Sequence, residues 1–292
     1  MTVRRRTFLK TAISGAAVTA ISGSLSSCFS NTTQTKGSFN NFGIQLYSLK
    51  DVLPEDPKGV LKKLAGMGYT QIESFEGDKG MFWGMTNTEF KKYIDGIGLN
   101  MISSHCNYKE NFERKAAEAA EIGLKYLIVP SVGPRKNIDD FKRIAEGFNE
   151  AGDICKKAGI RFAYHNHAYS FQPVEGQLPQ EVMMQNTNPE TVDFEMDIYW
   201  VDTAGANPVE WFEKYPNRFR LCHIKDRLKG APQDGENYSC VVGTGEIDFP
   251  AILKVGKEKG LKYYIIEQEN FDNITPIEAA AQNASYMKKG VI

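Results

Sequence analysis

From Asn41 to the end of the chain, short apolar runs alternate with longer amphipathic stretches, and this alternation constrains the fold more than any other feature. Such a pattern is typical of strand–helix units in a parallel sheet. The expected strands are 42–47, 69–75, 99–105, 125–130, 160–166, 191–198, 219–225 and 262–268. The expected helices are 57–66, 87–96, 111–122, 138–158, 179–186, 207–215, 248–259 and 275–289. Eight such units within residues 41–292 predict an α/β fold, a single-domain (β/α)8 TIM barrel.

Glycine follows the end of many expected helices, where a left-handed residue closes the last turn and the chain enters a strand directly. The glycines at these junctions are Gly68, Gly98, Gly123, Gly159 and Gly260. An open doubly wound sheet is the alternative arrangement of alternating strands and helices. That sheet is expected to carry a glycine-rich phosphate-binding turn after its first strand, and residues 44–48 read Ile-Gln-Leu-Tyr-Ser instead. The closed barrel is therefore favoured.

Charge and cysteine content argue against several classes of function. The net charge of −1 offers no broad positive surface, so no nucleic-acid partner is expected. The five cysteines are odd in number and include no Cys-x-x-Cys pair. Neither a disulfide framework nor a cysteine-ligated zinc site is therefore indicated.

The first 28 residues have the features of a targeting signal, not of a folded domain. Arg5-Arg6, followed by Phe8-Leu9-Lys10, resembles a twin-arginine export signal. The weakly hydrophobic residues 11–23 are too few and too polar to span a membrane comfortably.

A lipid-attachment sequence and a linker follow. Leu25-Ser26-Ser27-Cys28 resembles a bacterial lipobox, in which the cysteine carries the lipid. Residues 29–40 are rich in serine, threonine and asparagine, as a tether would be. We therefore expect residues 1–28 to be a twin-arginine, lipoprotein-type signal and the protein to be exported by a bacterium. It would be periplasmic or a membrane-anchored lipoprotein, touching the membrane only through its lipid.

Polar side chains of metal-binding types interrupt four of the expected strands near their carboxyl ends. In a parallel barrel these ends meet at one mouth. A charge on a buried strand face is costly unless it is paired, hydrogen-bonded or bound to a metal. The residues concerned are Glu195 and Asp197, His223 and Lys225, His165 and His167, and Glu267 and Glu269.

On these residues the chain resembles the xylose isomerase-like TIM barrels, known as sugar phosphate isomerases and epimerases, over about residues 41–292. Epimerases of this family hold a divalent metal with Asp, His and Glu on the sixth, seventh and eighth strands. The matching residues here are Asp197, His223 and Glu267. On the fifth strand ketose epimerases carry a glutamate, whereas Tyr164-His165-Asn166-His167 resembles the inosose dehydratase branch. His165 is the best candidate for the fourth ligand, and His167 is the alternative.

The resemblance implies one divalent metal ion. Imidazole with carboxylate suits Mn²⁺, Zn²⁺, Fe²⁺ or Co²⁺ better than Mg²⁺. Such an ion polarises a sugar carbonyl, so that a side-chain base can remove the neighbouring proton. The candidate catalytic residues are Glu267, His167, His105 and Lys225. The candidate substrate-binding residues are Gln45, Tyr47, Glu73, Trp200 and Glu269.

The expected function is a metal-dependent sugar isomerase or epimerase that abstracts a proton next to a metal-bound carbonyl. Without the fifth-strand glutamate, the alternative is a lyase or dehydratase on a 3-keto-glycoside or inosose-like substrate. A second alternative is a non-catalytic carbohydrate-binding lipoprotein. A small sugar is the expected partner, and a homo-oligomer remains open.

Overall fold

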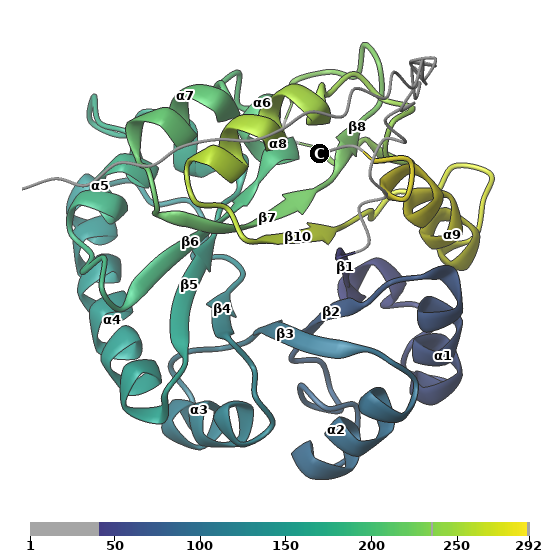
Figure 1. Ribbon diagram of the computed structural model, residues 1–292. Coiled ribbons are helices and arrows are strands. Elements are labelled where there is room, and N and C mark those ends of the chain that lie inside the picture. The colour runs from purple at the N-terminus through teal and green to yellow at the C-terminus, as the bar shows by residue number, and fades with distance from the viewer. Residues whose placement is uncertain (1–40, 235, 291–292) are drawn as a thin grey trace, which may run out of the picture. The chain divides into compact units, whose positions relative to one another are not determined.

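The computed structural model describes residues 41–234 and 236–290. Within these residues, eight parallel strands close into a barrel in the order β1, β2, β3, β4, β5, β6, β7, β10, and helices surround it (Figure 1). The strands are β1 Gly43–Gln45, β2 Gln71–Phe75, β3 Asn100–His105, β4 Tyr126–Val129, β5 Arg161–His165, β6 Val192–Asp197, β7 Phe219–Ile224 and β10 Tyr263–Ile266. The predicted single-domain barrel is confirmed, and every strand limit lies within two residues of its expected position.

The expected helices are also present, with limits within two residues of those predicted. They are α1 Pro57–Met67, α2 Asn87–Gly96, α3 Phe112–Glu121, α4 Ile138–Ala158, α5 Pro179–Gln185, α7 Pro208–Lys214, α8 Phe249–Glu258 and α9 Pro276–Met287. Local hydrogen bonds set these limits. Thr86 and Glu89 form a capping box that begins α2. Gly159, at φ 85°, ends α4 in the left-handed conformation that its position in the sequence predicted.

Two expected strands end early because the side chain of their last residue caps a helix that follows directly. The Gln45 side chain accepts the N–H of Tyr47, and the 3-10 helix η1 Leu46–Leu49 follows β1 directly. Asp197 Oδ1 accepts the N–H of Trp200, so helix α6 Ile198–Thr203 begins where β6 ends. Asp197 is thus both the last strand residue and a helix N-cap, which fixes its carboxylate at the barrel mouth.

The segment after β7 contains a small antiparallel sheet of β8 Asp226–Arg227 and β9 Ser239–Cys240. The buried Asp226 carboxylate accepts backbone N–H groups from Gly243 at 2.8 Å and Gly245 at 2.9 Å. A Cβ on Gly245 would lie 2.2 Å from the Arg227 carbonyl oxygen, so glycine is required there. These bonds hold the segment in a defined conformation.

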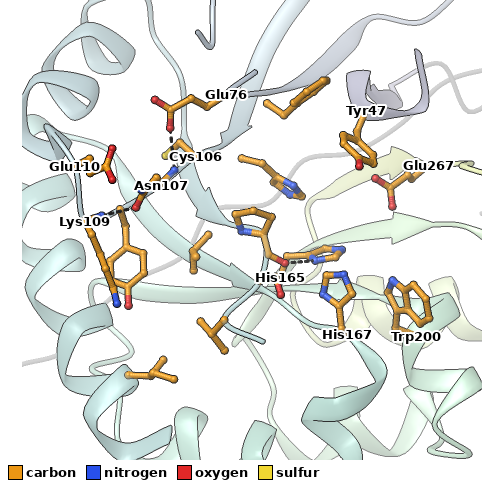
Figure 2. Close-up of a pocket in the computed structure, with 18 of the residues that line it drawn as sticks. Tyr47, Glu76, Cys106, Asn107, Lys109, Glu110, His165, His167, Trp200 and Glu267 are labelled. Carbon is orange, nitrogen blue, oxygen red and sulfur yellow. Dashed lines mark hydrogen bonds between the residues drawn. The ribbon is translucent and has the colours of Figure 1, made fainter. Parts of the chain in front are cut away.

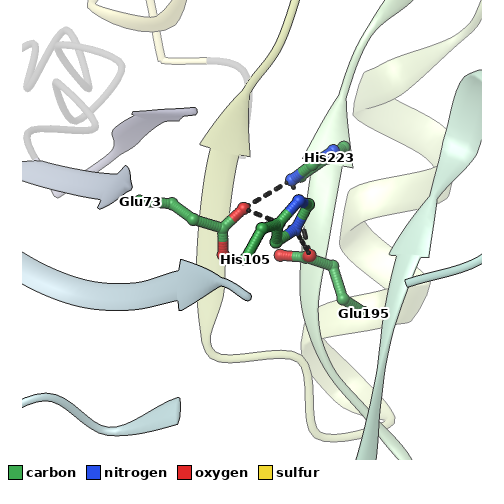
Figure 3. A group of neighbouring side chains, drawn as sticks. All are labelled: Glu73, His105, Glu195 and His223. Carbon is green, nitrogen blue, oxygen red and sulfur yellow. Dashed lines mark hydrogen bonds and ion pairs between the residues drawn. The ribbon is translucent and has the colours of Figure 1, made fainter. Parts of the chain in front are cut away.

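The barrel interior changes from apolar at its amino-terminal end to polar at the mouth. Tyr126, Ile128, Ala163 and Leu221 form the apolar floor. Buried Glu73, Glu195 and His223 lie inside the same ring of strands (Figure 3). No helix among residues 41–234 and 236–290 has both the length and the apolar character to cross a bilayer. The predicted export signal at 1–28 and linker at 29–40 lie outside the described residues.

Candidate metal centre and active-site cavity

The structure brings together four residues predicted as metal ligands. His165 ends β5, Asp197 ends β6, His223 lies on β7 and Glu267 follows β10. One ligand atom from each lies within 4.8 Å of the others, and all four residues are buried. We call these four residues the metal cluster.

Two imidazole nitrogens and two carboxylate oxygens converge in the metal cluster. His165 Nε2 lies 3.1 Å from His223 Nδ1 and 3.3 Å from Asp197 Oδ2. His223 Nδ1 lies 3.3 Å from Glu267 Oε2. The pKa of Asp197 is held well below its usual range because, although burial opposes this, His165 and His223 favour the carboxylate. Lys225 and His223 similarly outweigh burial and lower the pKa of Glu267.

The outer nitrogen of each histidine has an acceptor of its own. His165 Nδ1 lies 2.9 Å from the Pro130 carbonyl oxygen, and His223 Nε2 lies 2.8 Å from Glu73 Oε1. Each of these nitrogens therefore donates, which leaves the inner nitrogens to offer lone pairs. At 3.1 Å the two inner nitrogens share at most one proton, whereas a metal ion accepts both lone pairs. This donor set fits a divalent ion such as Zn²⁺, Mn²⁺, Fe²⁺ or Co²⁺.

A second buried group, which we call the barrel cluster, consists of Glu73, His105, Glu195 and His223 (Figure 3). Hydrogen bonds already satisfy its central carboxylate: Glu73 Oε1 accepts from Gln45 Nε2 at 2.7 Å and Oε2 from Ser103 Oγ at 2.5 Å. His105 Nε2 lies 2.9 Å from Glu195 Oε2. The barrel cluster therefore holds the outer nitrogen of His223, on the side of the ring that faces away from the metal cluster.

Charge within the barrel cluster is balanced by His105. Burial alone would lower the pKa of His105, but Glu73 and Glu195 raise it to about 9. His105 is therefore an imidazolium at neutral pH. Burial, reinforced by the Glu73 charge, raises the pKa of Glu195.

The metal cluster lies at one end of a cavity of about 780 Å³ (Figure 2). His165 and Glu267 of the cluster line this cavity, and so do His105, His167, Tyr47, Trp200 and Glu269. His167 is outside the cluster, with its ring stacked on Tyr169 at 5.7 Å and on Trp200 at 5.4 Å between centroids. Burial lowers the pKa of His167 to about 3, so it is a neutral wall residue. The structure thus places His165, and not His167, in the metal cluster.

Gln45 and Glu73, predicted to bind substrate, and Lys225, predicted to be catalytic, are not among the residues that line the cavity. Gln45 and Glu73 are fully buried and hydrogen-bonded to each other. Lys225 is fully buried behind Glu267 and Glu269, and it forms ion pairs with both. These carboxylates outweigh burial and raise the pKa of Lys225, which stays an ammonium. The bonds of these residues support side chains around the cavity, and direct contact of any of the three with substrate stays a prediction.

Sequence reasoning missed most of the other end of the cavity. The residues that it missed lie in loops after β2, β3 and β4, and include Glu76, Asn107, Lys109, Glu110, Ser131 and Arg135. Loops carry no periodic pattern, so only the general rule that loops after barrel strands surround the active site points to these residues.

Comparison with known proteins identifies the family. Residues 61–290 match the model of the xylose isomerase-like TIM barrel. A sugar phosphate isomerase/epimerase from Parabacteroides distasonis is 34% identical, with a TM-score of 0.74, covering 85% of this chain and 93% of that one. An inosose dehydratase from Clostridium perfringens is 26% identical over 167 residues, which is 52% of this chain and only 56% of that relative. The structure of the IolI protein with a bound zinc atom, at 17% identity and TM-score 0.70, covers 86% of this chain and 97% of that one, and shares the fold. The chain belongs to the xylose isomerase-like TIM barrel family.

Proposed function

We propose that the protein is a metal-dependent enzyme that removes a proton next to the carbonyl of a keto-sugar or keto-cyclitol. The observation that carries this proposal is the convergence of two imidazole nitrogens and two carboxylates at the end of a cavity. A divalent ion held there would polarise the substrate carbonyl and make the adjacent C–H acidic. The bound zinc of the structure that shares the fold and the names of the sugar-processing relatives support this proposal.

The proton acceptor is a carboxylate on one side of the cavity. Glu267 and Glu269 both line it, immediately after β10. Lys225 bonds both carboxylates, and Asn237 Nδ2 donates to Glu269 Oε1 at 3.0 Å. These bonds orient the two carboxylates toward the same space. Lys225 and His223 outweigh burial and lower the pKa of Glu267, so this carboxylate is ionised, as a base must be.

The proton donor comes from the other side of the barrel. His105 ends β3, which is separated from β10 by β1 and β2. Its side chain lines the cavity, and Glu73 with Glu195 keeps it protonated at neutral pH. One carboxylate base and one imidazolium acid suit β-elimination. The base takes the proton next to the carbonyl, a carbon–carbon double bond forms, the carbon–oxygen bond one atom further breaks, and the acid protonates the leaving oxygen.

This arrangement favours a dehydratase or lyase within the proposed class. Ketose epimerases of the family take one of their two bases from a glutamate on the fifth strand, and this position offers His165 here. With Nδ1 bonded to Pro130 and Nε2 in the metal cluster, His165 has no nitrogen left to accept a proton. Epimerisation is the second candidate, because the 34%-identical structure is a sugar phosphate isomerase/epimerase.

Product analysis by NMR in D₂O separates the candidates. Metal-loaded protein would be incubated with an inosose and with a 3-keto-glucoside, beside protein stripped of metal by a chelator. Elimination yields a new double bond and a released water or alcohol, whereas epimerisation yields solvent deuterium at an inverted carbon. Sugar binding that survives metal removal, without turnover of any keto-sugar, would instead support the non-catalytic carbohydrate-binding alternative.

We also propose export and lipid anchoring, which rest on the sequence of residues 1–28 alone. The expected location is the cell envelope. Replacing Cys28 by Ala should release the protein from the membrane fraction, and replacing Arg5 and Arg6 by Lys should retain it in the cytoplasm. Fractionation of the two variants beside the unaltered chain tests both steps.

A further inference from the structure

We propose that the end of the cavity remote from the metal cluster is a subsite for a second sugar, so that the substrate is a glycoside with its reacting ring at the metal cluster. This inference rests on the proposed function and names its substrate class. We call this end the distal lobe, lined by Glu76, Asn107, Tyr108, Lys109, Glu110, Ser131 and Arg135.

The cavity is larger than one sugar ring requires. Its volume of about 780 Å³ lies in the upper part of the range of about 300–1,000 Å³ that encloses drug-sized ligands. A monosaccharide is smaller than such ligands. In Figure 2, His165, His167, Trp200 and Glu267 lie at one end, whereas Asn107, Lys109 and Glu110 lie at the other. A single ring bound at the metal cluster leaves the distal lobe unfilled.

The β4–α4 wall of the distal lobe is held in place by bonds from the segment after β5. Tyr169 Oη accepts the backbone N–H groups of Val132 at 3.0 Å and Gly133 at 3.1 Å, and it bonds Ser131 Oγ at 2.9 Å. Glu175 Oε2 accepts the N–H of Ile138, where α4 begins. The loop between β4 and α4 is therefore pre-organised, which lowers the entropy cost of binding.

The opposite wall, after β3, is anchored in the same way. Glu76 Oε2 accepts the N–H of Asn107 at 2.9 Å and a bond from Lys115 Nζ at 2.7 Å. Asn107 Oδ1 in turn accepts the N–H of Lys109. Across the lobe, neither Lys109 nor Arg135 forms an ion pair with a carboxylate of the described residues. Arg135 Nη1 donates to the Pro134 carbonyl oxygen at 3.5 Å, and the Lys109 ammonium lies 5.7 Å from the centroid of the Tyr108 ring. The other side-chain N–H groups of both residues are available to a ligand.

The mixture of groups in the distal lobe fits hydroxyls better than it fits an anion. Lys109 and Arg135 donate, Glu110 accepts, and the Asn107 amide and Ser131 hydroxyl do both. The ring of Tyr108 adds an apolar surface beside them. A phosphate or carboxylate would meet the Glu110 and Glu76 carboxylates, whereas sugar hydroxyls pair with donors and acceptors alike.

The distal lobe is open toward a second hollow. A groove of about 590 Å³ between α3 and α4 shares Tyr108, Lys109, Arg135 and Ile144 with the cavity. These four residues therefore lie between the distal lobe and the groove.

The test compares two substrates that share the reacting ring, a 3-keto-glucose and the corresponding 3-keto-disaccharide, with metal-loaded protein. The expected preference for the disaccharide in kcat/KM is about tenfold or more, arising from KM, because charge-assisted hydrogen bonds are lost without the second ring. A Lys109→Ala/Arg135→Ala double variant should narrow this preference to below about threefold. The matched control is Lys142→Ala, an exposed α4 lysine that pairs with Asp139, and it should keep the full preference.

Equal kcat/KM for the two substrates, or a preference for a sugar phosphate over the disaccharide, would overturn the subsite and leave the proposed reaction standing. Calorimetry with unoxidised maltose and glucose provides a readout that needs no turnover. Binding of maltose but not of glucose supports the subsite if the double variant binds maltose more weakly. If no keto-sugar reacts in the same experiments, only the proposed function fails. Absence of any maltose binding beside turnover of the keto-monosaccharide rejects the subsite alone.

Discussion

The metal cluster and the barrel cluster contain the same types of residue but differ in their hydrogen bonds. Each contains two histidines and two carboxylates, each is buried, and they share His223. In the barrel cluster the Glu73 carboxylate accepts hydrogen bonds from Gln45, Ser103 and His223. In the metal cluster the N–H groups of both histidines are directed outward, so the inner nitrogens and carboxylates face one another.

The comparison teaches that the position of the N–H groups on the histidines distinguishes the metal cluster from the barrel cluster that supports it. The barrel cluster balances its carboxylates with a proton on His105, whose pKa Glu73 and Glu195 raise to about 9 against the effect of burial. The metal cluster has carboxylates whose pKa values are held low and two lone pairs that a divalent ion satisfies. His223 contributes Nε2 to the barrel cluster and Nδ1 to the metal cluster. The Glu73 carboxylate therefore acts on the metal cluster through the His223 ring.

The largest expected effect is that of Asp197→Asn, which removes a carboxylate from the metal cluster alone. Bound metal should fall from about one ion per chain to a small fraction, and kcat/KM should fall roughly 1,000-fold, because polarisation of the carbonyl is lost. Elemental analysis and steady-state kinetics provide the measurements. Asp193→Asn, on the same strand and paired with Arg161, is the control and should keep its metal. Full activity without metal in Asp197→Asn would remove the proposed distinction between the clusters.

The pH dependence of the unfolding free energy tests whether a proton on His105 stabilises the barrel cluster. The pKa of His105 is raised from 6.5 to about 9, so its stabilising effect is fully present below pH 6.5 and disappears as the pH rises through 9. This rise corresponds to about 3 kcal/mol of unfolding free energy. Chemical unfolding of metal-free protein between pH 6 and 10 should therefore show a decline in wild type that His105→Gln lacks. Parallel curves for the two proteins would show that His105 carries no stabilising proton.

The barrel could be predicted from the sequence because it follows from periodicity, whereas the four members of the metal cluster were chosen among the polar side chains at its mouth by the resemblance to the family. Alternation located the strands, and the carboxyl end of each strand placed His165, Asp197 and Glu267 at one mouth. Depth along the barrel axis could not be predicted in the same way. Gln45 and Glu73 are fully buried and bonded to each other, and neither is among the residues that line the cavity.

Tertiary contacts and loops set the rest of the site. Lys225 follows a strand that carries a metal-cluster residue, yet Glu267, Glu269 and the Trp200 ring enclose it. No local pattern encodes that enclosure. The distal lobe depends on loops that Tyr169 and Glu76 hold from other parts of the chain, so its shape exists only after folding.

Glu73→Gln tests how strongly the barrel cluster acts on the metal cluster. The replacement keeps the size of the side chain and removes the charge that His223 Nε2–H faces. Loss of a carboxylate behind a ligating histidine typically weakens metal affinity about 10–100-fold. Competition with a chelator measures this affinity. If wild type instead binds two ions per chain and Glu73→Gln binds one, the barrel cluster is itself a metal site and the comparison fails.

The smallest effect should come from Ser103→Ala, which keeps the Glu73 charge and removes one of its donors. Ser103 Oγ lies 2.5 Å from Glu73 Oε2, the oxygen that does not contact His223. An unsatisfied buried oxygen should lower the unfolding free energy by about 1–3 kcal/mol. Ser285→Ala, an exposed α9 serine bonded to the Ala281 carbonyl, is the control and should change it by less than about 0.5 kcal/mol. Because the Glu73–His223 bond survives in Ser103→Ala, metal affinity should fall less than in Glu73→Gln. Equal losses would mean that the orientation of Glu73, and not its charge, transmits the effect to His223.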